Sequence, residues 1–300
     1  MQIPAGRGIV SPVIRVEPYD IASVVTGAIR LDGGAMFGVV PKVLWSEVAK
    51  PDELNRVQLS TRTLVAVDRT GGRVVLVDTG CGTKWAPDGI RRYKIEFDPT
   101  AIDRYLQTLD LSAQDVTDIV VTHLHFDHNG GLTEWVDESG GPTRLRYPNA
   151  RHWVHQRHWD HAHRPHLKDR GSFLKEDFDC LADADVLCRV EGDQPSPPFE
   201  GVEWFVSFGH TPYQLHPVFG VGDQKLLFAG DLVPTVAHLR LGWVMAYDVE
   251  PMRTIDEKRI VFRHALDEGW WLALPHDPST GGIAIEGTPE RPVVARALDL

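Results

Sequence analysis

The sequence predicts a layered α/β fold, because short apolar runs of strand type alternate with segments of helical periodicity. Five runs rich in Val, Leu, Phe and Trp have the length of buried strands, and each leads into an Asp or a His: 73–80, 118–125, 202–210, 225–231 and 270–276. Polar residues just beyond strand ends lie where loops carry chemistry on a rigid scaffold.

Two segments between these strands have helical spacing. The segment 98–110 places apolar residues on one helical face, at Ile102, Tyr105, Leu106 and Leu109. The segment 254–269 is expected to open on a capping box of Thr254 and Glu257 and to close on Gly269. Candidate site residues extend from 123 to 276, so the site requires the whole chain folded together. We therefore expect one domain over residues 1–300.

Composition and charge exclude several classes of protein. The formal net charge of −11 argues against general affinity for nucleic acid or anionic membrane, since both need a basic face. The start "MQIPAGRGIVSPVIRV" lacks the apolar region of a secretory signal, and no apolar run has the length of a membrane span. The three cysteines have no CxxC spacing and fit reduced thiols: Cys81, Cys180 and Cys188. We expect a cytoplasmic protein that binds neither nucleic acid nor membrane.

The stretch "VVTHLHFDHNGG" crowds three histidines and an aspartate into six residues behind an apolar run. These residues are His123, His125, Asp127 and His128. Imidazole and carboxylate together suit zinc or a similar borderline metal. A bare HxH would more often be a polar surface loop. The full HxHxDH pattern between a strand and a glycine pair favours a metal site.

Further motifs follow this stretch in order. They are His210 in "GHTP", Asp231 in "AGD" and His276 in "PHD", and Asp78 stands earlier in "VDTG". With these matches the sequence resembles the metallo-β-lactamase superfamily over about two-thirds of the chain. The resemblance implies an αββα sandwich of two packed mixed β-sheets flanked by helices, with the site at one edge.

The resemblance also implies a dinuclear metal centre. His123, His125 and His210 would hold one divalent ion, Asp127, His128 and His276 the other, and Asp231 would bridge them, with Asp78 as structural support. Zinc is the expected metal, with iron, cobalt and manganese as alternatives. A metal-bridging hydroxide would attack an ester-type carbonyl, with Asp127 and Asp231 as the catalytic carboxylates. Redox di-iron relatives typically carry Glu in place of His125, so the imidazole favours a hydrolase.

Three segments are similar to the branch of N-acyl-homoserine-lactone lactonases, which act in quorum quenching, and methyl-parathion-hydrolase-like enzymes: 31–45, 55–67 and 231–251. The similarity implies lactone ring opening and a small-molecule ester or lactone as the partner. An apolar flap would hold the acyl chain, although core packing explains its four residues equally well: Met36, Phe37, Val39 and Val40. The expected substrate contacts are Met36, Phe37, Phe126, Tyr213 and His238.

Two positions depart from that branch. Tyr213 replaces a glycine in "GHTPYQ", and Pro234 stands where the lactonases usually place a tyrosine. His238 and Tyr247 are the candidates to replace that tyrosine. The substrate therefore stays open between a lactone, a phosphotriester and a glyoxalase II-like thioester. A non-catalytic binding protein of the same fold is the remaining alternative.

The segment "RHWVHQRHWDHAHRPH" (151–166) contains six histidines. His-rich tracts can bind metal. However, His155, His158 and Trp159 also suit an amphipathic helix, and relatives carry a helical excursion near the entrance at this place. We expect a surface or lid helix within an excursion around 151–175 rather than a third metal site. The sequence leaves a homodimer open.

Overall fold

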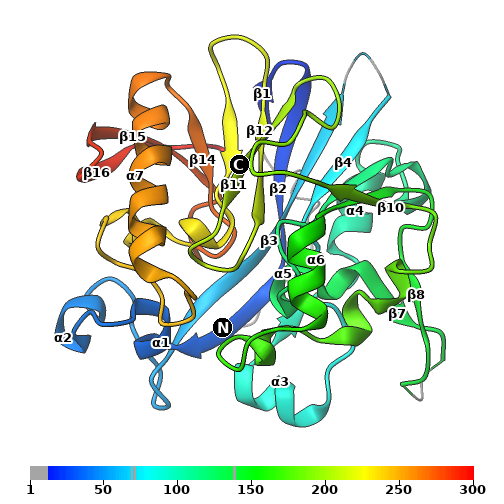
Figure 1. Cartoon of the computed structure of the whole chain (residues 1–300), viewed down its shortest axis with the longest axis horizontal. Helices are drawn as coiled ribbons and strands as arrows, with labels where there is room; N and C mark the ends of the chain where they lie inside the picture. Colours follow the sequence, from blue (N-terminus) through cyan, green and yellow to red (C-terminus); the bar gives the residue numbers. More distant parts are fainter. Residues whose placement is uncertain (1–12, 69, 71, 138–139) are drawn as a thin grey trace.

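Two mixed β-sheets packed face to face, with helices outside each, form the layers of the molecule (Figure 1). The computed structural model describes residues 13–68, 70, 72–137 and 140–300. The predicted αββα sandwich is confirmed. The expected absence of a secretory signal depends mainly on residues 1–12, which lie outside the described residues, and the single domain over 1–300 stays a prediction.

The first sheet has the order β1-β2-β3-β4-β6-β9-β10, with β5 paired to β2. Its strands β1 to β4 are antiparallel, whereas β4, β6, β9 and β10 run parallel. The bounds are β1 Ile14–Val16, β2 Tyr19–Asp32, β3 Arg56–Asp68, β4 Val74–Val77, β5 Glu96–Phe97, β6 Asp118–Val120, β9 Arg151–His155 and β10 Leu187–Val190. A separate hairpin consists of β7 Thr133–Trp135 and β8 Thr143–Leu145.

The second sheet follows chain order from β11 to β16. All its neighbours are antiparallel except β13 and β14, which are parallel. The bounds are β11 Val202–Ser207, β12 Gln214–Phe219, β13 Leu226–Phe228, β14 Trp271–Ala273, β15 Gly282–Thr288 and β16 Arg291–Ala297. Each of the five predicted apolar runs contains a strand (β4, β6, β11, β13 and β14), and each strand ends before the Asp or His that follows it.

The α-helices are α1 Gly33–Phe37, α2 Lys42–Trp45, α3 Pro87–Tyr93, α4 Ala101–Gln107, α5 Phe126–Asn129, α6 Gln156–His163 and α7 Pro251–Asp267. Short 3₁₀ turns span Ala113–Asp115, Gly130–Leu132, Arg170–Ser172, Lys175–Asp177, Asp179–Leu181, Gly230–Leu232 and Val236–Leu239. Among the described residues, no helix combines the length and the hydropathy that crossing a lipid bilayer requires.

The predicted start of the last helix was wrong. Helix α7 begins at Pro251, so Thr254 lies within it and does not cap it. The carboxylate of Glu257 instead accepts hydrogen bonds from the backbone N–H groups of Phe208 and Gly209, at 2.9 and 3.0 Å. Proline is favoured at the first helical position, because the N–H that it lacks would have no partner within the helix there. This preference explains why the helix starts at Pro251. The predicted end holds, because Gly269 follows the helix with a left-handed φ of 72°.

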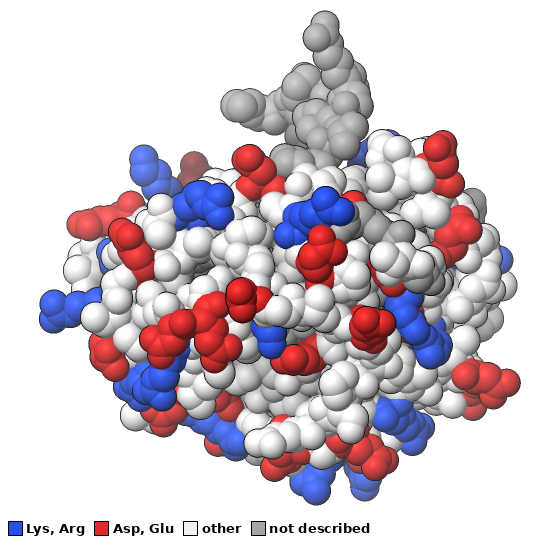
Figure 2. All heavy atoms as spheres, turned by 90° about the horizontal axis from the view of Figure 1, so that it is seen from above, with Lys and Arg blue, Asp and Glu red and all other residues white. Residues whose placement is uncertain are grey.

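Three apolar layers hold the sandwich together. Val75, Val77 and Val120 of the first sheet pack against Phe219 and Phe228 of the second. Helices α4 and α6 cover the outer face of the first sheet, and α7 covers the outer face of the second (Figure 1). On the face shown in Figure 2, acidic and basic side chains are interspersed without an extended patch of one sign. This face therefore has no continuous basic surface for nucleic acid.

Strand direction brings the predicted site residues to one edge of the sandwich. Parallel strands end at the same edge of a sheet. The loops after β4 and β6 carry Asp78 and His123, and those after β13 and β14 carry Asp231 and His276. Strand β11 runs in the same direction as β13, since both are antiparallel to β12, so His210 after β11 reaches this edge too.

A buried ion pair fixes the glycine turn behind the HxHxDH loop. Lys84 Nζ donates to the carbonyl oxygens of Gly130 (2.6 Å) and Thr133 (2.8 Å) and lies 3.1 Å from Asp177 Oδ1. Both charged side chains are almost fully buried, at 2% and 3% exposed. Burial raises the pKa of the Asp177 carboxyl to about 6, although the adjacent ammonium lowers it. The pair is therefore sensitive to the loss of either partner.

We predict that Lys84→Met lowers the free energy of unfolding by about 3 kcal/mol, because it leaves a buried carboxyl without its cation. The deficit should shrink from about pH 8 to about pH 5, since a carboxyl whose folded pKa is raised stabilises the fold as it takes up its proton. Urea unfolding of both proteins at the two pH values measures this. Arg91→Met, which breaks the exposed pair with Asp88, is the control and should change little. Equal unfolding midpoints for Lys84→Met and the parent chain would contradict the prediction.

Candidate metal centre

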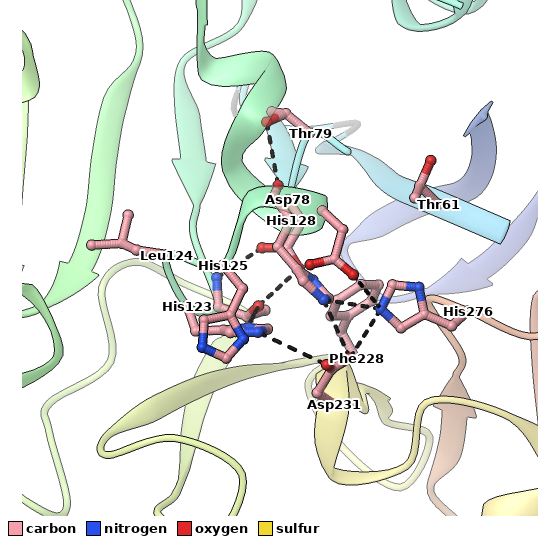
Figure 3. Close-up of polar contacts among 12 residues, drawn as sticks. Thr61, Asp78, Thr79, His123, Leu124, His125, His128, Phe228, Asp231 and His276 are labelled. Carbon is pink, nitrogen blue, oxygen red and sulfur yellow. Dashed lines mark hydrogen bonds and ion pairs between the residues drawn. The ribbon is translucent and has the colours of Figure 1, made fainter. Parts of the chain in front are cut away.

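The predicted ligand residues converge in two groups at the edge of the sandwich (Figure 3). One group contains His123, His125, His210 and Asp231, and the other contains Asp127, His128 and His276. The potential ligand atoms within each group lie within 4.8 Å of one another, and all seven residues are buried. The division between the two groups is the one that the resemblance implied.

Asp231 stands between the two groups and turns one carboxylate oxygen to each. Its Oδ2 lies 3.2 Å from His210 Nε2 and 4.0 Å from His123 Nε2. Its Oδ1 lies 3.2 Å from His128 Nε2 and 3.0 Å from His276 Nε2. This arrangement suits a carboxylate that bridges two cations.

Hydrogen bonds at the far side of each ring determine which imidazole nitrogen faces the site. His128 Nδ1 donates to Asp78 Oδ2 at 2.8 Å, and His276 Nδ1 donates to the Ser60 carbonyl at 2.8 Å. His210 Nδ1 donates to Asp248 Oδ1 at 2.9 Å. With Nδ1 protonated, a neutral ring presents the lone pair of Nε2, which is the form that ligates metals.

The resulting lone pairs face one another in a way that a cation would resolve. His276 Nε2 lies 3.0 Å from His128 Nε2, although both rings already donate through Nδ1. Among the described residues, the buried Nε2 atoms of His123 and His125 have no hydrogen-bond partner. Unpaired buried polar atoms are costly unless a partner satisfies them. The donor set, imidazole nitrogen with carboxylate oxygen, therefore fits divalent ions of the zinc type.

Burial and charge favour the ligating state of His123, His125 and Asp231, whereas at His128 and His210 the charge of Asp231 and of other nearby carboxylates outweighs burial and raises the pKa. Burial lowers the pKa of His123 and of His125 well below the usual range, and neighbouring imidazoles lower it further. Burial alone would raise the pKa of Asp231, but His128, His276 and His210 outweigh it, so that carboxyl pKa lies well below the usual range. Neutral His123 and His125 beside an ionised Asp231 are what metal binding at neutral pH requires.

The supporting side chains include one predicted residue and three that the sequence reasoning missed. Asp78, the predicted support, also accepts hydrogen bonds from the backbone N–H and hydroxyl of Thr122, both at 2.8 Å. Asp248 had no local motif that marked it, whereas Glu257 was assigned to a helix cap and His158 to an amphipathic helix. The general need of a ligand histidine for a carboxylate partner was the available signal, and it pointed to no particular residue.

His158 lies at the centre of the His-rich tract and bridges two loops of the site. Its Nε2 accepts from the Leu124 N–H at 2.8 Å, and its Nδ1 donates to the Pro212 carbonyl at 2.8 Å. Burial lowers the pKa of His158 to about 3, so the bridge is a neutral imidazole. Among the described residues, neither metal-capable group includes a histidine of the tract.

The rest of the excursion around 151–175 consists of β9, α6 and a 3₁₀ turn, so it is only partly helical. His161 Nε2 lies 2.6 Å from Asp169 Oδ2, and His163 Nδ1 donates to the Trp159 carbonyl at 2.9 Å. These contacts hold the excursion together internally. Lys168, Gly171 and Ser172 of the excursion reach the mouth of the cavity described next.

A cavity of about 220 Å³ opens onto Asp127, Asp231 and His276. Apolar and aromatic side chains form much of its wall: Leu31, Met36, Leu59, Tyr93, Phe126, Met245 and Tyr247. Two of the expected substrate contacts, Met36 and Phe126, therefore lie in the wall. The described lining leaves out Phe37, Tyr213 and His238, and Val39 is 93% exposed.

Tyr213 and His238 have partners elsewhere. The Tyr213 ring stacks on His155 with centroids 4.5 Å apart, and its hydroxyl accepts from Arg157 at 2.7 Å. The φ of Tyr213 is 60°, a left-handed conformation that favours glycine. The contacts with His155 and Arg157 stabilise this conformation for a tyrosine. His238 Nε2 donates to the Met36 carbonyl at 2.9 Å, which turns this ring away from the site. Neither residue therefore belongs to the described lining of the cavity.

We predict that protein prepared without chelator holds close to two equivalents of divalent metal, one for each group of ligands. Asp231→Ala should lower this content and weaken retention against a chelator, because both groups lose their shared carboxylate. Elemental analysis after dialysis measures it. Asp256→Ala, at an exposed position of α7, is the control. A stable content of one equivalent that Asp231→Ala leaves unchanged would contradict the prediction.

Comparison with known proteins supports the reading of the site. The chain is 27% identical over 187 residues to the N-acyl homoserine lactonase AttM of Azorhizobium caulinodans, which covers 58% of this chain and 62% of that protein. The match thus spans less than two-thirds of that relative's length. A solved structure of a "probable metal-dependent hydrolase" from Staphylococcus aureus superposes with a TM-score of 0.80 at 25% identity, covering 95% of this chain and 100% of that one.

The dizinc quorum-quenching lactonase AidC, solved with the product N-hexanoyl-L-homoserine, superposes with a TM-score of 0.72 at 17% identity. The superposition covers 95% of this chain and 97% of that one, and at this identity it supports the fold alone. The family model of the metallo-β-lactamase superfamily matches residues 60–281, which include all seven converging ligand residues. The chain therefore belongs to the metallo-β-lactamase superfamily.

Proposed function

We propose that this protein is a dinuclear-metal-dependent hydrolase that opens lactone rings, or cleaves related esters, that carry an apolar substituent. The observation that carries the proposal is the pair of metal-capable groups that share Asp231 and open into a cavity with an apolar wall. The similarity to a relative named as an N-acyl homoserine lactonase favours a lactone among the esters. Zinc, a role in quorum quenching and a cytoplasmic location are further parts of this proposal.

The seven ligand residues would hold two divalent ions, which when bound polarise a carbonyl group and activate water for attack. Asp127 and Asp231 line the cavity, and both present carboxylate oxygens to the same space. Asp127 Oδ2 lies 3.6 Å from His276 Nε2, beside the metal-capable groups. In this position it can accept a proton from the attacking water and hold it for the departing oxygen.

The apolar wall would bind the substituent of the substrate. Leu31, Met36, Leu59 and Met245 offer aliphatic contacts, and the ring of Phe126 packs between Trp85 and Tyr93. Burial of a methylene group contributes about 0.8 kcal/mol to binding. Because the wall is apolar and the floor is polar, the substrate would enter with its ester toward the floor and its substituent along the wall.

Tyr247 is the phenol that we propose in place of the lactonase tyrosine, whose usual position holds Pro234. Tyr247 lines the cavity together with the ligand residues, whereas His238, the other candidate, does not belong to the described lining. Burial raises the pKa of Tyr247, and the nearby carboxyl groups of Asp127 and Asp32 raise it further. The phenol therefore stays protonated and can donate a hydrogen bond to an oxygen of the substrate.

A pH-stat panel tests the reaction class on metal-loaded protein. Acyl-homoserine lactones, paraoxon-type phosphotriesters and glutathione thioesters each release protons on hydrolysis. We expect the highest kcat/KM for a lactone and loss of activity after chelation. No proton release from any lactone, together with rapid hydrolysis of a phosphotriester, would move the assignment to a phosphotriesterase. Inactivity toward all three classes would favour the alternative hypothesis of a non-catalytic binding protein with the same fold.

We predict that Tyr247→Phe lowers kcat toward the preferred lactone by about 100-fold with little change in KM, because a donor to the reacting oxygen is lost. Metal content and the free energy of unfolding should stay the same, since Tyr247 lines the cavity, is only partly buried and belongs to neither group of ligand residues. Steady-state kinetics on both proteins measures this. Tyr93→Phe removes another phenol from the same wall and is the matched control. Equal losses for both variants would mean that Tyr247 has no special role.

A further inference from the structure

A second, larger cavity lies beside the reaction cavity. Its volume is about 550 Å³, and it lies between the α1–α2 region, the turn at 236–239 and strand β16. Apolar side chains supply much of its lining, among them Phe37, Val48, Val57, Val236, Ala237 and Val293. Its polar lining includes the exposed Lys50 and Arg240 as well as the buried residues Thr235, His238 and Asp277. Four of its apolar lining residues are buried, Met36, Phe37, Val57 and Leu59, and this part of the cavity suits an apolar chain.

The two cavities share a thin wall. Met36 and Leu59 line both, so these two residues lie between the reaction cavity and the second cavity. Met36 is 1% exposed and Leu59 is 3% exposed, which shows that the wall is closed to solvent. Met36 comes from α1 and Leu59 from β3, so two separate elements meet here.

The backbone behind Met36 is held firmly. The Met36 carbonyl accepts a hydrogen bond from His238 Nε2, and His238 Nδ1 lies 2.8 Å from Thr235 Oγ1. The next residue, Phe37, is stacked between Trp45 and His238, with ring centroids 5.3 and 5.1 Å away. These contacts hold the main chain of the wall at Met36 in place.

The reaction cavity is small for a substrate with a long substituent. At about 220 Å³ it lies below the ~300–1,000 Å³ that is typical of small-molecule sites. A chain that outgrows it can leave through the mouth past Lys168 and Ser172, where further methylenes gain no burial. A chain that instead points toward Met36 and Leu59 meets the residues that the two cavities share.

We propose that Met36, together with Leu59, sets the upper length of the acyl chain that this enzyme uses, so that its substrates are esters or lactones with short acyl substituents. This inference rests on the proposed hydrolase function. Each methylene that is buried should raise kcat/KM by up to about fourfold, and the rise should stop when the chain meets the wall. Removal of the Met36 side chain joins the two cavities and moves this limit to longer chains.

The test compares four proteins: the parent chain, Met36→Ala, Ala237→Phe and the double variant. Ala237 lines the second cavity but not the described reaction cavity, so phenylalanine there fills only the second one. We would measure kcat/KM for N-acyl-homoserine lactones from butanoyl to dodecanoyl. We expect an early plateau for the parent chain and for Ala237→Phe, a later plateau for Met36→Ala, and a return to the early plateau in the double variant.

Calorimetric binding of linear carboxylates of the same lengths to the metal-loaded proteins gives a second readout that needs no turnover. If no lactone is hydrolysed but carboxylate affinity shows the same shift, the proposed function fails and the wall remains as described. An unchanged plateau in Met36→Ala would overturn the inference. A plateau at shorter chain length in the single variant Ala237→Phe than in the parent chain would also overturn it. The acyl chain would then already enter the second cavity when Met36 is present. Leu59→Ala and Val48→Trp repeat the design if either first variant does not fold.

Discussion

The carboxylate of Asp231 is the interaction on which the site depends. Four imidazoles from three loops surround it, His123 and His128 after β6, His210 after β11 and His276 after β14, and the carboxylate is buried. An ionised carboxylate in such a place requires compensating charge, and imidazoles in their neutral, ligating form do not supply it, since they offer only lone pairs. The geometry therefore makes sense as the framework of two cations that a single carboxylate joins.

Such a framework needs its loops held at fixed separations, and buried polar side chains do this. Asp78 joins the ends of β4 and β6 through Thr122 and His128. Glu257 of α7 receives the two N–H groups just before His210. His158 then ties the HxHxDH loop to the loop after His210, since one ring contacts Leu124 and Pro212. A misplaced ligand would weaken metal binding, so these residues act on the chemistry through position.

The sequence predicted the parts of the molecule that local patterns determine. Five apolar runs marked strands that lead into the site, and the spacing within "HLHFDH" marked the ligands, because strand period and metal chemistry are both readable over a few residues. The start of α7 was misplaced because Thr254 and Glu257 have the spacing of a cap, whereas Glu257 serves a loop far away in sequence. Asp248 could not be identified, and Tyr247 could not be chosen over His238, because the segment after the 236–239 turn reaches the site only in the folded chain.

The role of Tyr213 could not be predicted from the sequence either. The family pattern has glycine there, and the left-handed φ of 60° explains why glycine is favoured. The sequence alone therefore pointed to a functional reason for the tyrosine. The structure offers a different one, since His155, Arg157 and Phe208 surround the ring and stabilise the conformation that glycine would adopt freely.

Metal binding and local stability are linked in this arrangement. The three histidines whose Nδ1 atoms are held by Asp78, Ser60 and Asp248 cannot rotate to satisfy Nε2 without breaking a buried hydrogen bond. Ions that bind the folded site and not the unfolded chain add about 2.7 kcal/mol of stability at a concentration one hundred times their dissociation constant. The strands have their own apolar core between the sheets, so they do not require this contribution. The ligand loops lie at the edge of that core, and for them the ions would be the missing partners of the buried imidazoles.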